Sequence, residues 1–399
     1  MNKQLTLNQA AFYSEDRING SKVSRECFVT TDSMLQDKEG ITITPVLPKG
    51  SLIAFSEGDI LIGNIRPYLK KIWQADRKGG CSPDVLVLKA KPGFDPGFLY
   101  YSLFRDDFFN HMMKGSKGTK MPRGDKSQIL RFHIPEIDFN DQQQIAKVLA
   151  SIDAKINLNK KINVVLDEMA KTLYDYWFVQ FDFPNENGRP YKSSGGKMVW
   201  NEVLKREIPE GWQDGELKDI ANITMGQSPT GESYNEEGDG IIFFQGCTDF
   251  GHRYPTIRQF TTSPTRFAKE GDILLSVRAP VGTLNIAKED CCIGRGLAAL
   301  NSKDNCISYL FGVMVNLKQI FDRRNVDGTT FGSITKDDLF SLKVVKPDKE
   351  ILKKYYAIVN PAFQKQNKME LENLKLSEVR DWLLPMLMNE QVMVDSNKQ

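Results

Sequence analysis

The stretch FSEGDIL at residues 55–61 decides the fold, because the chain repeats it as FAKEGDIL at residues 267–274. Each copy leads into an arginine that is closely followed by a proline, within IGNIRPYL in the first copy and LSVRAPVG in the second. Recurrence of one pattern at a long spacing indicates a repeated structural unit. The chain is therefore expected to consist of two related halves.

Other landmarks recur in the same order. Cys81-Ser82-Pro83-Asp84 precedes the apolar run VLVL, and Cys292-Ile293-Gly294-Arg295-Gly296 precedes LAAL. Later, Gly118-Thr119-Lys120-Met121 matches Gly328-Thr329-Thr330-Phe331. Chance does not keep so many landmarks in order, so we interpret the pattern as a duplication.

Each half ends in a helical pattern, with apolar residues spaced by three and four over Gln142–Phe178 and over Lys349–Met388. Pro361 interrupts the second pattern and suits the first turn of a new helix with Asn360 as its cap, and Asp153 is the matching candidate cap in the first. We therefore expect a short helix and then a long one of about 25 residues, on the order of 37 Å, in each half. In the first helix Asn159 interrupts the apolar stripe and is a candidate for fixing the register between the helices.

Before each helix lies a globular part, here called a head, with short strand patterns and turn residues that favour an α+β structure. The predicted fold class is α+β, with two globular heads separated by two long antiparallel helices in a pseudo-twofold internal repeat. Gly, Pro, Ser and Asn between the halves indicate a connector. The expected boundaries are 1–140 for the first head, 141–180 for the central helix, 181–210 for the connector, 211–347 for the second head, 348–390 for the C-terminal helix and 391–399 for a tail.

Composition limits the class of protein. The 399 residues are 40% hydrophobic and 26% charged, which is typical of soluble globular proteins, and no apolar run of about 18 residues or export signal is evident. We expect a cytoplasmic protein with no membrane contact. The six cysteines form no C-x-x-C pair and the three histidines lie far apart, so the sequence predicts no metal site.

Each candidate catalytic motif in the sequence lacks a residue that the motif requires. The segment 118–127 lacks the G-K-[ST] of a phosphate loop, and the NPAF sequence at 360–363 lacks the second proline of the N-P-P-[YF] motif of amino-methyltransferases. Pro83-Asp84 and Pro347-Asp348 are not followed by the E-x-K of nucleases. The sequence therefore predicts a protein that is not an enzyme and needs no cofactor.

Local charge points to DNA, although the net charge of +2 is small for a protein that holds DNA alone. Residues 66–78 contain five cations and one acid, and residues 114–131 contain six cations, three glycines and one acid. Glycine-rich basic loops bring backbone amides and long cations close to phosphates. Any single cation is more often a solvated surface charge, so the set carries the argument: Arg66, Tyr68, Lys70, Lys71, Lys117, Lys120 and Arg123.

The second head offers amide, hydroxyl and basic side chains that suit base edges and phosphates. A helical spacer on the order of 37 Å would also suit half-sites one turn of DNA apart, about 34–36 Å. The alternative is that the helices are only a dimerisation or scaffold rod. The candidate DNA-binding residues of this head are Gln227, Ser228, Gln245, Arg278, Arg295, Thr329, Thr330 and Lys336.

These features together resemble the specificity subunit of type I restriction–modification systems over nearly the whole chain. The segments that carry the resemblance are GDILIGNIRPYL and GDILLSVRAPVG, QQQIAKVLASIDAKI at the start of the first helix, FPNENGRPYKSS and IPEGW around the connector, GQSPTGESYN at 226–235, and VRDWLLPMLMNEQV near the end. The first head departs from the pattern, since it carries INGSKVSRECFVTTDSML at 18–35 in place of a GQSP segment.

The resemblance implies that each head is a target recognition domain that reads one half of a split, asymmetric site in double-stranded DNA. The helices would act as a spacer and as docking surfaces for two methyltransferase subunits, and restriction subunits with motor and nuclease activity would join for cleavage. Methylation and cleavage would belong to those partners. Such partners would close around the DNA, which fits the small net charge.

Three alternatives remain open. The chain could be a stand-alone scaffold or anti-restriction decoy, a recognition module for a fused methyltransferase–nuclease, or an RNA-binding repeat protein. The last would need exposed aromatic platforms, which Tyr68 and Trp73 alone do not provide. Co-purification with a methyltransferase, and whether a neighbouring gene encodes a separate or a fused catalytic chain, would separate the other two.

Overall fold

The computed structural model describes residues 4–116, 118, 120–326 and 333–392. The chain divides into two compact units, which are residues 1–157 with 373–399 and residues 158–372. Each unit contains one head and part of each of two long helices, α5 (Phe139–Tyr174) and α9 (Lys349–Met388). The fold is mixed α+β, as the sequence predicts.

The first unit holds short strands and helices that precede α5. They are β1 (Gln4–Thr6), α1 (Leu7–Ala10), β2 (Ala11–Tyr13), β3 (Arg17–Asn19), η1 (Gly20–Lys22), η2 (Arg25–Cys27), β4 (Phe28–Val29), β5 (Ser51–Phe55), β6 (Ile60–Gly63), η3 (Pro67–Leu69), β7 (Ile72–Gln74), β8 (Gly79–Cys81), β9 (Val85–Ala90), α2 (Pro96–Leu103), α3 (Asp106–Lys114), α4 (Lys126–Ile129) and β10 (His133–Pro135).

The second unit continues from α5 through a π-helical turn, the connector and the second head. Its elements are η4 (Asp175–Val179), β11 (Met198–Asn201), β12 (Arg206–Pro209), β13 (Gln213–Glu216), α6 (Leu217–Ile220), β14 (Ala221–Met225), η5 (Gly231–Ser233), β15 (Tyr234–Asn235), β16 (Ile241–Phe244), η6 (Cys247–Asp249), β17 (Phe260–Thr261), β18 (Phe267–Ala268), β19 (Ile273–Ser276), β20 (Leu284–Ile286), β21 (Cys291–Ile293), β22 (Leu297–Ser302), α7 (Ile307–Val326), α8 (Lys336–Phe340) and β23 (Lys343–Lys346).

The repeated GDIL segment forms the same strand in both heads. In the first head the sheet order is β2-β9-β6-β7, and in the second it is β14-β22-β19-β20. Ile60 of β6 lies opposite Leu88 of β9, and Ile273 of β19 lies opposite Leu300 of β22. All four side chains are buried, because both faces of each strand are covered. The predicted duplication is therefore confirmed at the level of strand register.

A second sheet is also repeated, with different additions. β8 pairs with β4 in parallel and with β5 antiparallel, just as β21 pairs with β16 in parallel and with β18 antiparallel. The first head extends this sheet with β3 beside β5, whereas the second extends it with β17 beside β16. The two heads thus share a core and differ at the edges.

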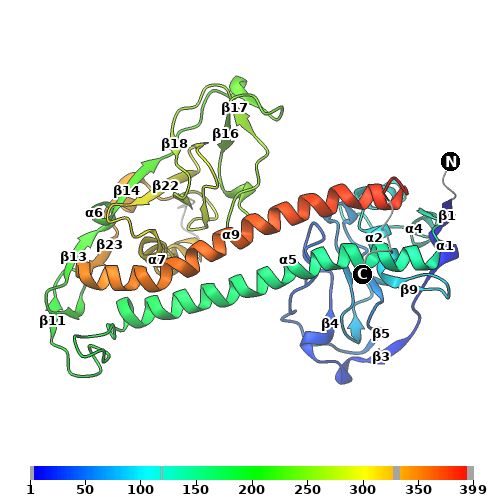
Figure 1. Cartoon of the computed structure of the whole chain (residues 1–399), viewed down its shortest axis with the longest axis horizontal. Helices are drawn as coiled ribbons and strands as arrows, with labels where there is room; N and C mark the ends of the chain where they lie inside the picture. Colours follow the sequence, from blue (N-terminus) through cyan, green and yellow to red (C-terminus); the bar gives the residue numbers. More distant parts are fainter. Residues whose placement is uncertain (1–3, 117, 119, 327–332, 393–399) are drawn as a thin grey trace. The chain divides into compact units, whose positions relative to one another are not determined.

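The expected helix break does not occur. α9 runs without interruption across Pro361, and α5 runs across Asp153 (Figure 1). The interpretation of Asn360 as a cap was therefore wrong. Proline removes one backbone hydrogen bond, but Val359 and Phe363 on either side are buried in the second unit. Their burial keeps α9 continuous. With 36 and 40 residues, α5 and α9 each exceed the long helix of about 25 residues that the sequence predicts.

Within each unit, α5 and α9 join the core of the head. In the first unit Leu149 of α5 and Leu384 of α9 belong to the head's apolar cluster. In the second, Asn159 is fully buried and its Nδ2 donates to Glu372 Oε2 over 2.8 Å, while Gln366 Nε2 donates to the carbonyl of Asn163 over 3.2 Å. Rising numbers on α5 meet falling numbers on α9, so the helices are antiparallel there.

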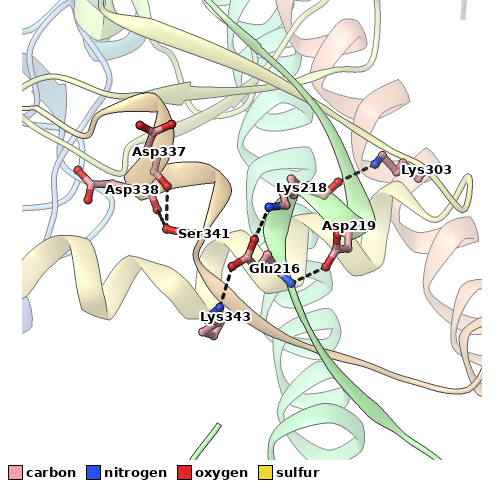
Figure 2. Close-up of polar contacts among 8 residues, drawn as sticks. All are labelled: Glu216, Lys218, Asp219, Lys303, Asp337, Asp338, Ser341 and Lys343. Carbon is pink, nitrogen blue, oxygen red and sulfur yellow. Dashed lines mark hydrogen bonds and ion pairs between the residues drawn. The ribbon is translucent and has the colours of Figure 1, made fainter. Parts of the chain in front are cut away.

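A salt-bridge cluster ties the start of the second head to its last strand (Figure 2). The Glu216 carboxylate lies 2.5 Å from Lys218 Nζ and 2.7 Å from Lys343 Nζ. The backbone N–H of Glu216 donates to Asp219 Oδ2 over 2.8 Å, which caps α6. Because Glu216 ends β13 and Lys343 begins β23, the cluster reinforces the pairing of these two strands.

The described residues contain neither a candidate membrane span nor a candidate metal cluster. None of the helices in these ranges is both long enough and apolar enough to cross a bilayer. Over the same ranges, no three His, Cys, Asp or Glu side chains gather as metal ligands would.

Candidate nucleic-acid interface

In the second head, several strand ends converge on one surface. The N–H of Gly226, just after β14, donates to the carbonyl of Leu297 over 2.9 Å, and the N–H of Gln227 donates to that of Ile293 over 3.0 Å. Gly294, just after β21, donates to the carbonyl of Phe244 over 2.8 Å. These bonds hold the loops that follow β14, β16 and β21 against one another.

Three predicted residues meet at this point. Gln245 Nε2 donates to Ser228 Oγ over 2.9 Å, and the backbone N–H of Arg295 donates to the same oxygen over 3.2 Å. Gln245 Oε1 is buried and has no hydrogen-bond partner among the described residues. The Arg295 side chain is exposed. The cluster thus combines a fixed amide, a hydroxyl and a cation, which are the groups that contact base edges.

Close backbone approach makes this arrangement depend on glycine. A Cβ on Gly296 would lie 2.7 Å from the carbonyl oxygen of Gln245, and one on Gly294 would lie 2.9 Å from its Cα. Both distances are shorter than ordinary contacts, so a side chain at either position would displace Gln245.

The remaining predicted residues of this head are placed separately. Arg278 is exposed and forms an isolated bridge with Ser333, and the N–H of neighbouring Val277 donates to the carbonyl of Gly296 over 2.9 Å. This bond brings Arg278 to the same surface as Arg295. Lys336 lies in the first turn of α8 with its ammonium 5.3 Å from the Phe340 ring centroid. Gln227 is exposed, and Thr329 and Thr330 lie outside the described residues.

In the first head, the two basic segments are held together by backbone bonds. The N–H of Arg66 donates to the carbonyl of Pro122 over 2.8 Å, and Ile65 forms a bridge with Arg123. The N–H of Gly124 donates to the carbonyl of Asn64 over 3.1 Å. Arg66 is exposed and left-handed, with a φ of 53°. Arg66 and Arg123 therefore lie at one surface.

Asp84 belongs to this cluster, and sequence reasoning missed it. Its Oδ1 lies 3.0 Å from Arg123 Nη2, with 38% and 58% of the two side chains exposed. An exposed ion pair of this kind contributes little stability, so its effect is to orient Arg123. In the sequence, Asp84 stands directly before the buried VLVL strand, at a strand end near the surface. The sequence pattern suggested only a nuclease Pro-Asp pair, so its role beside Arg123 was missed.

The other predicted residues of the first head differ in their exposure and in whether they have partners within the protein. Lys70 Nζ lies 2.8 Å from Asp106, which Lys38 also contacts at 3.0 Å. Partial burial raises the pKa of Asp106, but the two lysines outweigh this and hold the pKa below its usual value. Lys71 Nζ donates to the carbonyl of Thr31 over 2.7 Å. Tyr68 is half exposed and Lys120 is exposed, while Lys117 lies outside the described residues.

The arginines that the sequence aligns are not structurally equivalent. Gly63 of β6 faces Val85, and Ser276 of β19 faces Leu297, at the first residues of β9 and β22. Counting onward from these positions, Pro67 matches Pro280, whereas Arg66 matches Ala279 and Arg278 matches Ile65. The two arginines are therefore offset by one residue, and the heads present different side chains at the same surface.

The GQSP loop has no counterpart at the matching strand end. β2 stops at Tyr13, opposite Leu88, whereas β14 continues to Met225, opposite Ala298. The first head turns away into β3 where the second extends toward Gln227 and Ser228. This difference agrees with the departure noted in the sequence.

Comparison with known proteins gives a consistent result. The family model described as "Type I restriction modification DNA specificity domain" matches residues 11–168 and again residues 209–379. The chain is 35% identical over 274 residues to a protein of Methanocaldococcus jannaschii described as an MjaX type I restriction enzyme specificity subunit, covering 67% of this chain and 61% of that protein. The match thus spans less than two thirds of that relative.

Two further similarities cover almost the whole chain. The type I restriction enzyme HindI specificity subunit of Haemophilus influenzae is 22% identical over 436 residues, covering 92% of this chain and 94% of that protein. The crystal structure of the type I restriction–modification S subunit from M. genitalium matches with a TM-score of 0.59 at 17% identity, over 97% of this chain and 96% of that one. This second likeness concerns the fold.

Proposed function

The chain belongs to the family of type I restriction–modification DNA specificity subunits, and we propose that each head binds one half of a split, asymmetric DNA site. The family role is non-catalytic, since it supplies specificity to the complex. One observation carries the proposal: the equivalent strands β6 and β19 lead to exposed arginines, Arg66 and Arg278, which are offset by one residue and have different polar neighbours. Arg278 lies near the cluster of Gln245, Ser228 and Arg295 in the second head, whereas Arg66 lies near the Arg123–Asp84 pair in the first.

The remaining predicted residues are proposed as additional DNA contacts. Lys336 and Arg278 would contact phosphates or bases of the second half-site, and Lys120 and Tyr68 those of the first. Lys70 and Lys71 are weaker candidates, because both already have internal partners. Lys117, Thr329 and Thr330 stay proposals from the sequence alone.

We propose that α5 and α9 dock two methyltransferase subunits and that restriction subunits join this assembly. Exposed apolar side chains on α5 support the idea, namely Leu158, Val165 and Met169, which are 53%, 61% and 45% exposed. They are spaced by seven and four residues and so share one helical face. Apolar side chains gathered on one exposed face are common where a partner helix packs.

The helices are also proposed to set the spacing between the two half-sites, as the sequence suggests. Their lengths of 36 and 40 residues are compatible with a stiff spacer. Methylation and ATP-driven cleavage would be carried out by the partner subunits, and the protein would act in the cytoplasm, where prokaryotic DNA lies.

The test is to map methylated adenines in cells that express the partner methyltransferase with and without this chain. A split motif that appears only when the chain is present is the expected result. Replacing residues 211–347 by the head of a relative should change one half of the motif and leave the other. Failure to co-purify with the methyltransferase, together with an unchanged methylation pattern, would favour the decoy or scaffold alternative instead.

A further inference from the structure

The second unit contains a cavity of about 640 Å³ apart from the proposed DNA surface. Its walls come from the C-terminal part of α5, the segment 175–180, the N-terminal halves of α7 and α9, and the segments 252–253 and 284–286. None of the candidate DNA-binding residues lines it. The volume lies in the range of small-molecule sites, about 300–1,000 Å³.

Arg253 is the unusual group of this cavity. It is only 6% exposed, and its guanidinium carbon lies 4.3 Å from the Phe363 ring centroid. Its Nε donates to Asn367 Oδ1 over 2.6 Å, but Nη2 is buried without a hydrogen-bond partner in the described parts of the chain. Burial lowers the pKa of Arg253, which indicates that the protein compensates its charge incompletely.

Asp167 provides only weak compensation. Its Oδ1 lies 3.8 Å from Arg253 Nη1, and 44% of its side chain is exposed. The same oxygen accepts a hydrogen bond of 2.6 Å from Gln366 Nε2. The guanidinium therefore keeps both charge and a donor available for an anionic group.

A second residue of the cavity wall, Asn285, has an unsatisfied acceptor. Asn285 is 2% exposed, and its Nδ2 donates to the carbonyl of Gly251 over 2.9 Å, which leaves Oδ1 buried with no partner among the described residues. Buried polar atoms are normally bonded to protein or to water. The rest of the wall combines apolar and aromatic side chains, among them Tyr174, Phe311, Val315, Tyr355, Val359 and Phe363, with the charged side chains of Glu168, Lys171 and Asp175.

We infer that this cavity binds a small apolar carboxylate, with the carboxylate on Arg253 and the apolar body against the aromatic walls. A carboxylate oxygen would accept from Nη2 and balance the buried charge. A donor on the ligand, such as an ammonium or hydroxyl, would satisfy Asn285 Oδ1. A free apolar amino acid and the C-terminal residue of a peptide share this chemistry. The inference is independent of the proposed DNA recognition.

The test measures binding of 3-phenylpropanoate to the full chain by isothermal titration calorimetry, with 3-phenylpropanamide as the uncharged control. We expect one saturable site, with the amide bound about 10- to 100-fold more weakly because it lacks the charge-assisted bond. At ten times the Kd, 3-phenylpropanoate should raise the Tm by about 3 °C. L-phenylalanine and the peptide Ala-Ala-Ala-Phe then distinguish the two sources of the ligand, since the true source should bind more tightly.

Two variants test whether the ligand binds in this cavity. Arg253→Gln removes the cation and should weaken binding of 3-phenylpropanoate at least tenfold, whereas Arg258→Gln, a matched change in an exposed arginine that pairs with Asp249, should leave it unchanged. Val315→Trp fills the cavity and keeps Arg253, so it tests the site even if Arg253→Gln does not fold. Binding that is absent, that needs more than about 10 mM ligand, or that survives Val315→Trp would overturn the inference and leave ordered water as the occupant.

Discussion

Arg380 Nη1 on α9 donates to Asp153 Oδ1 on α5 over 2.8 Å, and this pair joins the two helices inside the first unit. Only 15% and 20% of the two side chains are exposed. Asp153 also accepts a 2.7 Å hydrogen bond from the Tyr101 hydroxyl, and the Arg380 guanidinium lies 4.7 Å from the Phe104 ring centroid. One ion pair thus fastens both helices to the head.

Arg380→Ala should destabilise the first unit by about 3 kcal/mol, because it leaves the largely buried Asp153 carboxylate without its cation. The measurement is the free energy of unfolding from a urea titration. Lys353→Ala is the control, since its pair with Glu350 is exposed at both ends and should contribute less than about 0.5 kcal/mol. Equal effects of the two substitutions would show that the Arg380 pair does not hold the helices.

The salt-bridge cluster of Glu216 predicts a pH dependence (Figure 2). Hydrogen bonds from Lys218 and Lys343 lower the pKa of Glu216 from its usual value of 4.5 to about 2. A carboxyl whose folded pKa is depressed stabilises the fold above the unfolded pKa and loses that contribution as the pH falls through the folded pKa. The contribution should therefore be complete above about pH 4.5 and disappear between pH 4.5 and 2.

Glu216→Gln removes this titration and is the test. Between pH 5 and 3 the Tm of the native protein should fall more steeply than that of the variant. Glu202→Gln is the control, because Glu202 is exposed and forms only a surface ion pair with Lys205. This substitution should leave the slope of Tm against pH unchanged. Parallel Tm curves for the native protein and Glu216→Gln would contradict the assigned role.

In the first head, Arg66→Ala or Arg123→Ala should weaken binding of DNA that carries the first half-site about tenfold or more, because each removes an exposed cation from the proposed surface. Fluorescence anisotropy at two salt concentrations measures the effect, and the salt dependence should become shallower. Lys205→Ala, in the connector, is the control. An arginine whose removal leaves the affinity intact is not a DNA contact.

Sequence and structure agree where a pattern is fixed by burial. The GDIL segments were predictable because a one-residue shift would turn their buried side chains to the wrong face, which fixes their register. Arg66 and Arg278 lie just beyond those strands, where no burial constrains them. Their one-residue offset can be counted from the GDIL segments, but only the structure shows that Ile65 and Arg278 form the equivalent bridges, to Arg123 and to Ser333.

Other features depend on neighbours distant in the sequence. Asp84 forms its ion pair with Arg123. Arg253 contacts residues of α5 and α9 that are more than eighty positions away in the sequence. No local pattern signals such contacts. Pro361 shows the opposite error, because a strong local signal was outweighed by the burial of Val359 and Phe363.

In the second head, Gln245→Ala should change the second half of the methylated motif and leave the first half intact. The substitution removes the amide held by Ser228 and leaves the Arg295 backbone bond to Ser228 in place, so the surface should keep its shape. Each mismatched base pair of a specific site typically costs about 1–3 kcal/mol, so the expected result is a relaxed base preference at one position of the motif.

Sequencing of methylated adenines from cells with each variant reads out this change. Gly296→Ala is the structural counterpart, because its Cβ would lie 2.7 Å from the carbonyl oxygen of Gln245 and displace the backbone that carries the Gln245 side chain. Both variants should therefore relax the same base position, whereas Arg66→Ala should act on the other half. If Gln245→Ala altered both halves, or neither, Gln245 would be a packing residue and base recognition in this head would lie with Arg278 and Arg295.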